Sequence, residues 1–129
     1  MNTRKQSTLK AFNTWDKRAF NYGDADCCQF TGHVIKEITG IDYMKLFDYE
    51  NEPEAERIIE SHGGLDQAVE TMLGKPTTLD NLQDGDPVLF KAPMMDDALG
   101  VMFGKFIVGL SHRKIVRVSQ RYFVHGWPL

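Results

Sequence analysis

The side chain with the clearest chemical potential in this chain is the thiol of Cys27. Residues 22–27 read Tyr-Gly-Asp-Ala-Asp-Cys, and an apolar stripe with helical spacing continues to Thr39, before Gly40. A cysteine in the first turn of a helix meets exposed amide N–H groups and about half a positive charge from the helix dipole. Both stabilise a thiolate and lower the thiol pKa from roughly 8.5 toward physiological pH. The pattern therefore makes Cys27 a candidate nucleophile.

A second interpretation is that Cys27 and Cys28 are small core residues, because free cysteine is among the most buried residue types. The two residues are neighbours in sequence. They are therefore too constrained for an ordinary structural disulfide, and the chain needs no oxidising compartment. The sequence alone leaves both interpretations open.

The residues around Cys27 must position it. Asp24 and Asp26 have the short acceptor side chains of turns and helix N-caps, and we interpret them in that role rather than as acid catalysts. The helix itself is expected over 27–39. At 100° per residue, His33 points about 120° away from Cys27 and is expected to face solvent. The packed side carries, with Cys27, the side chains of Thr31, Val34 and Ile38.

Three further helices are expected along the first half of the chain. Ser7 is expected to cap the first of them, whose packed side carries Leu9, Phe12 and Trp15. The other two are expected over 53–63 and 65–73, each ended by glycine. His62 falls in a last turn, where a cap or a dipole partner accounts for it.

After residue 76 the pattern changes from helical to extended. The Asp-Gly-Asp sequence at 84–86 is a turn signal. Helices followed by an antiparallel sheet indicate an α+β fold rather than a parallel βαβ sheet. A chain of 129 residues with 42% hydrophobic content fits one domain over 1–129. Four short strands are expected, over 87–92, 99–103, 105–110 and 114–118.

Charge is unevenly distributed along the chain. Residues 42–97 carry fourteen Asp or Glu against four Lys or Arg, a net charge of −10, whereas the flanks together carry +7. Basic residues in 113–121 alternate with apolar ones, as on a strand. A nucleic-acid-binding face is one interpretation of this pattern. A solvated face, or one that meets the acidic middle or a protein partner, is the interpretation we favour, so no nucleic-acid partner is expected.

Other features of the sequence argue against a membrane protein, a secreted protein and a metal-binding protein. No apolar run approaches the roughly 20 residues of a membrane span, and residues 1–8 lack the apolar core of a signal peptide. We therefore expect synthesis in the cytoplasm and no membrane insertion. Vicinal cysteines make a poor zinc clamp, so neither a metal nor a cofactor is expected. Ligand spacing is likewise missing among the histidines, His33, His62, His112 and His125.

The order of these motifs resembles the NlpC-like cell-wall cysteine peptidases of the papain-like superfamily. In that family Asp-Cys opens the helix, Gly-Asp precedes an apolar strand, and a His-Val-Gly-Ile strand follows. The matching pieces here are Asp26-Cys27, Gly85-Asp86, and the Ala-Leu-Gly-Val-Met-Phe-Gly sequence of 98–104. The resemblance covers most of the chain. It implies a papain-like α+β fold with Cys27, the family's nucleophile, at the N-terminus of the central helix.

The sequence departs from this family at Ala98, where the peptidases have the histidine that takes the thiol proton and later protonates the leaving amine. Alanine can do neither. In a serine protease, losing the histidine of such a unit costs on the order of a millionfold in turnover. His112, 14 residues further on, is the first candidate for a relocated base, and its alternative is a solvent-facing loop histidine. His125 is the second candidate.

A closer resemblance is to a small group of phage and prophage proteins encoded among tail genes. The features shared with that group are the spacing within 22–27, Phe30, residues 39–42, residues 98–101 and Trp127. This resemblance implies a component of the virion tail, at the tail tip or in tail assembly, that binds other tail proteins and has become a pseudoenzyme. The alternative is an active endopeptidase that cuts bacterial peptidoglycan with Cys27 and His112. A third hypothesis is an unrelated cytoplasmic enzyme or regulator.

Overall fold

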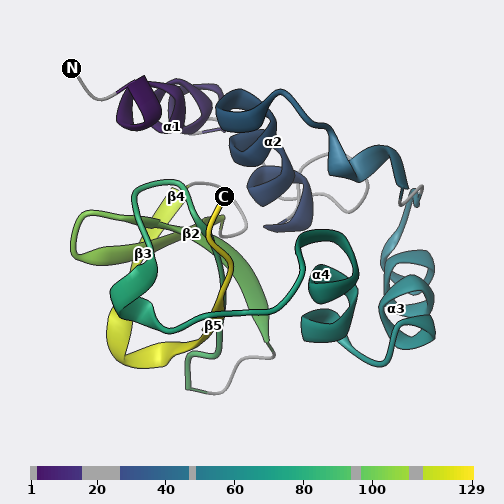
Figure 1. Cartoon of the computed structure of the whole chain (residues 1–129). Helices are drawn as coiled ribbons and strands as arrows, with labels where there is room; N and C mark the ends of the chain where they lie inside the picture. Colours follow the sequence, from purple (N-terminus) through teal and green to yellow (C-terminus); the bar gives the residue numbers. More distant parts are fainter. Residues whose placement is uncertain (1–2, 16–26, 47–48, 94–96, 111–114) are drawn as a thin grey trace.

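The computed structural model describes residues 3–15, 27–46, 49–93, 97–110 and 115–129. Within them, helices come first and a five-stranded antiparallel sheet follows, so the fold is α+β as predicted (Figure 1). None of the helices in these ranges is long and apolar enough to cross a membrane. The helices are α1 Thr3–Trp15, α2 Cys27–Thr39, α3 Glu52–Ser61 and α4 Leu65–Leu73, with short 3-10 helices η1 Tyr43–Leu46, η2 Leu79–Asn81 and η3 Gln120–Tyr122.

The sheet contains the four expected strands and a fifth that the sequence analysis missed. The strands lie side by side in the order β4-β3-β2-β1-β5, and every neighbouring pair is antiparallel. The missed strand, β5, follows β4 after one 3-10 turn but pairs with β1 at the opposite edge. The strands are β1 Pro87–Phe90, β2 Ala98–Phe103, β3 Phe106–Leu110, β4 Ile115–Ser119 and β5 Phe123–Gly126.

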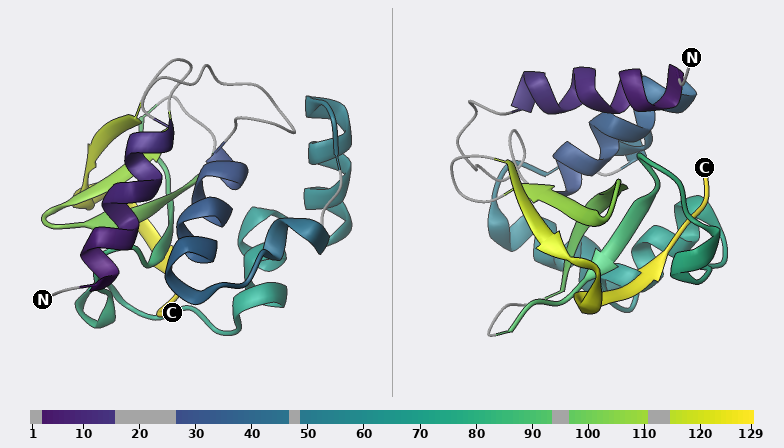
Figure 2. Two further views of the ribbon diagram at one scale, coloured as in Figure 1. Left: turned by 90° about the horizontal axis from the view of Figure 1, so that it is seen from above. Right: turned by 90° about the vertical axis from the view of Figure 1, so that its left-hand side faces the viewer.

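Alternation along the strands gives the sheet two packed faces. In β2, Leu99 and Val101 pack with buried residues of the helices, whereas Met102 packs with Phe90 and Ile107 of the neighbouring strands. Figure 2 shows α1 and α2 lying across the sheet on the helical side. Successive side chains of a strand point to opposite faces. Cys27 therefore lies on the helical face of the sheet, where α2 packs on β2 and β3.

The first helix differs from the prediction in its start and in one residue of its packed side. It begins at Thr3, so Ser7 lies inside the helix and does not cap it. Trp15 and Phe12 pack in the core as predicted, whereas Leu9 is 41% exposed and the buried residues Thr8 and Ala11 complete the packed side. Contacts distant in sequence explain the difference, because Arg4 in the first turn is held by residues just before β1.

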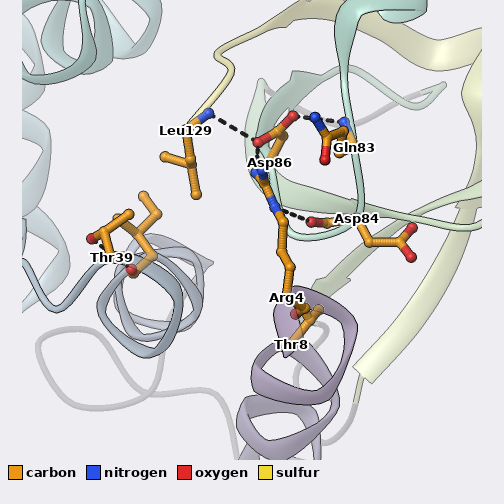
Figure 3. A network of polar contacts seen from close by, with 8 residues as sticks. Arg4, Thr8, Thr39, Gln83, Asp84, Asp86 and Leu129 are labelled. Atoms are coloured by element: carbon orange, nitrogen blue, oxygen red, sulfur yellow. Dashed lines mark hydrogen bonds and ion pairs between the residues drawn. The ribbon is translucent and has the colours of Figure 1, made fainter. Parts of the chain in front are cut away.

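Asp86 joins three distant parts of the chain (Figure 3). Its buried carboxylate, 1% exposed, pairs with the Arg4 guanidinium and accepts hydrogen bonds from the backbone N–H of Gln83 at 2.6 Å and of Leu129 at 3.0 Å. Arg4 Nε also donates to the carbonyl oxygen of Asp84 at 2.7 Å. Burial lowers the pKa of Arg4, and the charge of Asp84 raises it in opposition. This cluster holds the first helix, the start of β1 and the end of the chain together.

Candidate functional site

Cys27 is the first residue of α2, as predicted, and the helix runs to Thr39. The helix ends at Gly40, whose φ of 81° suits a residue without a Cβ and whose N–H donates to Lys36 O at 2.8 Å. The buried side chains of α2 include Phe30, Thr31 and Val34. The packed side of the helix was therefore predicted correctly, and it lies against β2 and β3 of the sheet.

The surroundings of Cys27 combine features of both interpretations made from the sequence. Cys27 and Cys28 are partly buried, and neither forms a disulfide. Both pack against one apolar cluster between α2, α4 and the sheet. The buried members of that cluster are Val69, Leu89, Leu99 and Trp127. The thiol of Cys27 thus lies at the tip of a helix, over β1 and β2, and the nucleophilic role stays a prediction.

Ala98, the position at which the resemblance leads us to expect a histidine, is the first residue of β2. It pairs with Phe90 of β1 and directly precedes Leu99, which belongs to the cluster around the two cysteines. The methyl group of Ala98 packs with the cluster on the other face, beside Phe90 and Met102. Position 98 is therefore next in sequence to the strand residue that meets the tip of α2, and its side chain is purely apolar.

Three of the residues singled out in the sequence lie outside the described part of the chain. They are Asp24, Asp26 and His112, so the proposed N-cap and the first candidate for a relocated base stay predictions. The second candidate, His125, is described. It lies in β5 directly opposite Leu89 of β1, and its ring centroid is 6.3 Å from that of Trp127. Residues opposite each other share a face of the sheet, so His125 is on the helical face, one strand beyond Leu89.

The other histidines of the described residues have structural contacts. His33 does not face solvent as predicted, because its Nδ1 lies 2.5 Å from Trp15 Nε1, which donates to it, and its Nε2 lies 3.3 Å from Glu37. A single-helix projection could not reveal that α1 packs along this side of α2. His62 is the C-cap of α3, with Nδ1 2.8 Å from Ile58 O, which confirms its predicted role. No cluster of three metal-binding side chains occurs in the part of the chain described here.

A family model described as "Domain of unknown function (DUF6950)" matches residues 2–129. The chain belongs to this DUF6950 family. No curated protein matches it. A solved structure, the crystal structure of the NlpC/p60 domain of peptidoglycan hydrolase SagA, is similar over 100% of both chains with a TM-score of 0.61 and 12% sequence identity.

The structural likeness confirms the predicted NlpC-like, papain-like fold of this DUF6950 protein. At 12% identity it shows the fold and leaves the chemistry of the site to the residues present. Those residues supply a thiol at a helix tip and an alanine at the start of the adjoining strand. Helix amides can stabilise negative charge on sulfur, but an alanine methyl can neither accept nor return a proton.

Proposed function

We propose that this protein works in the tail of a bacteriophage or prophage, at the tail tip or in tail assembly, as a structural and binding module on an NlpC-type scaffold. In this account the scaffold has lost its peptidase chemistry. The observation that carries the proposal is that the motif position at which the peptidases have their histidine is Ala98, the first residue of β2, whose methyl group packs on the face of the sheet opposite the Cys27 cluster.

The chemical argument concerns two proton transfers. Attack by a thiol requires a group that removes the thiol proton, and departure of an amine requires a group that returns a proton to nitrogen. One histidine does both in the peptidases that this chain resembles. With Ala98 in its place, the remaining uses of the fold are packing and binding, which need neither transfer.

The surface supports a binding role through its charge pattern. The helix α3 is strongly acidic, with Glu52, Glu56 and Glu60 exposed. At the far edge of the sheet, β4 carries the exposed Arg117, and Arg121 follows it. Opposite charges on separate surfaces of one domain favour oriented contacts with other proteins. The partners we propose are other tail proteins, and the location is the virion tail after synthesis in the host cytoplasm.

The test is to look for the protein in assembled tails. Virions induced from a host that carries the gene are purified by density gradient and examined by mass spectrometry, with a capsid protein of the same virus as the positive control. We expect the protein in virions or in tail-assembly intermediates. A strictly monomeric protein that is absent from both would contradict the proposal.

A second candidate function is an active peptidoglycan endopeptidase, with peptidoglycan as substrate and Cys27 as nucleophile. Two observations favour it: the position of Cys27 at the first residue of α2, and the placement of His125 on the helical face of the sheet. The base would be His112 or His125. If this function holds, Ala substitution of one of these two histidines abolishes the release of peptide fragments, and substitution of His62 does not.

A further inference from the structure

A groove separate from the Cys27 cluster lies between α1 and the β4 edge of the sheet. Its volume is about 350 Å³, and the described residues that pack around Cys27 do not line it. Its apolar residues also belong to the cluster between α1, α2 and the sheet, so the groove opens onto the core. Ligand sites commonly combine such apolar walls with a few polar groups. The lining residues are Phe12, Asn13, Phe103, Val108, Ile115 and Arg117.

Arg117 supplies a positive charge at this groove. It lies opposite Val108 in the register of β3 and β4, so its side chain is on the helical face of the sheet. The residue is exposed, and its Cζ lies 5.2 Å from the centroid of the Phe106 ring. Within the described part of the chain, no acidic side chain forms an ion pair with it. A carboxylate of a partner can therefore bind Arg117 without displacing one from this chain.

The strand that carries Arg117 is an edge of the sheet. One side of β4 pairs with β3, and its outer side has no strand neighbour among the described residues. An edge presents backbone N–H and C=O groups with which another extended segment can pair. Arg117 is the middle residue of β4, so a symmetric antiparallel pair of two β4 strands would place two guanidinium groups opposite each other. Like charges in that position are destabilising, so this edge favours an acidic strand over a second copy of itself.

We propose that the groove and the β4 edge together are the docking site for an extended acidic segment of a partner protein. The segment pairs with β4 as a further strand, and one of its carboxylates binds Arg117. Side chains two positions apart in a strand share a face, so a bulky apolar side chain two residues away enters the groove beside Phe12 and Ile115. This inference rests on the binding role proposed above, for which it names a surface and the chemistry of the partner.

The probe is a capped synthetic peptide, Thr-Glu-Thr-Phe-Thr-Glu-Thr, which places both carboxylates and the ring on one face in either strand direction. Methyl groups of Val108 and Ile115 report on the groove in NMR titrations, and those of Val88 and Ile107 on the other face of the sheet are internal controls. We expect saturable shifts of the groove methyls alone, and none with a peptide that has lysine for glutamate. Equal binding of the lysine peptide, or no saturable binding of the glutamate peptide, overturns the proposal. So does self-association of the protein through the same methyls.

Two matched comparisons test the carboxylate contact and the strand pairing separately. Arg117→Gln should weaken binding of the glutamate peptide by about three- to tenfold, the loss of one charge-assisted contact. Arg121→Gln is the control, because the guanidinium of Arg121 lies over Tyr122 outside the groove, and it should change the affinity by less than about twofold. Equal affinities in the two variants overturn the proposal.

Strand pairing uses the N–H groups on one edge of the peptide only. N-methylation of the threonine nitrogens in one peptide, and of the glutamate and phenylalanine nitrogens in another, blocks opposite edges. We expect one of these peptides to bind and the other not to bind, whereas equal affinities overturn the proposal. Peptide binding is measured on the purified protein, so its failure is distinct from the absence of the protein from virions.

Discussion

At the residue scale, the proposed function depends on Cys27 and Ala98. The first turn of α2 offers Cys27 the amides that a thiolate needs, and Ala98 offers the adjoining strand no proton acceptor. Both residues could be identified from the sequence, because Asp-Cys before an apolar stripe and Ala-Leu-Gly-Val in a strand are local patterns. The packing of both cysteines on Leu89 and Trp127 could not be, because it joins residues far apart in the chain.

The first prediction at this scale concerns thiol reactivity. In a Cys28→Ser background, the rate of Cys27 alkylation is measured across pH. If the thiol has lost its activation, the rate rises with a midpoint near roughly 8.5, the ordinary value for cysteine. A midpoint well below that value would favour the peptidase alternative. Unfolded protein in denaturant provides the reference for an unperturbed thiol.

A second prediction concerns the ion pair between Asp86 and Arg4. Substitution Asp86→Asn removes the negative charge and leaves a partly buried guanidinium without it. Breaking one side of a buried pair lowers the free energy of unfolding by about 3–5 kcal/mol, and we expect a loss near the lower end because Arg4 is partly exposed. Urea unfolding measures this loss. The exposed pair of Lys36 and Asp42 is the control, since Lys36→Ala should change the free energy of unfolding by less than about 1 kcal/mol.

At the scale of elements, Gly100 in the middle of β2 is the position that most strongly requires a glycine. A Cβ at this position would lie 2.5 Å from the backbone oxygen of Val108 in β3, and backbone cannot move aside as a flexible side chain can. The glycine of the Ala-Leu-Gly-Val sequence therefore allows β2 and β3 to pair closely.

Gly100→Ala tests this requirement against Gly104→Ala in the turn between the same strands. Gly104 has a φ of 60° and nothing within 4 Å of its missing Cβ, so its substitution costs only the strain of a left-handed residue, about 1–2 kcal/mol. We expect Gly100→Ala to lower the free energy of unfolding by about 2 kcal/mol more than Gly104→Ala does, because the added methyl group overpacks the site. Thermal unfolding compares the two, and equal loss in both variants would contradict the close approach.

Most helices and strands were predictable because their residues repeat with a clear period. The range 65–73 matches α4, and four strands were found within a few residues of their bounds. The exceptions depend on contacts distant in sequence. The strand β5 is four residues long and gains its partner at the opposite edge of the sheet. The exposure of Leu9 in α1 follows from the contacts of Arg4 and Trp15 with residues distant in sequence.

At the scale of the whole molecule, the last residues of the described chain join the helices to the sheet. Trp127 is fully buried, packs against α4 and the sheet, and donates from Nε1 to Gly74 O at 3.0 Å. The backbone N–H of Leu129 bonds to Asp86. Helices, sheet and C-terminal residues thus stabilise one another.

A further prediction follows for Trp127→Ala. Truncation of a buried tryptophan typically costs about 3–5 kcal/mol, and here it also leaves the Gly74 carbonyl without its donor. We expect a loss in that range in urea unfolding. The matched control is Val124→Ala in the preceding strand β5. Its side chain is 41% exposed, so the substitution should lower the free energy of unfolding by well under about 1 kcal/mol. Similar losses for the two would contradict the role given to Trp127.

The central claim is that this NlpC-type scaffold no longer cuts peptide bonds. Digestion of purified peptidoglycan tests it most directly, with the natural chain and Cys27→Ala assayed side by side and soluble fragments measured by mass spectrometry. We predict no fragments from either protein at concentrations where an active hydrolase releases them. Fragments from the natural chain that disappear with Cys27→Ala would contradict the claim and establish the enzyme.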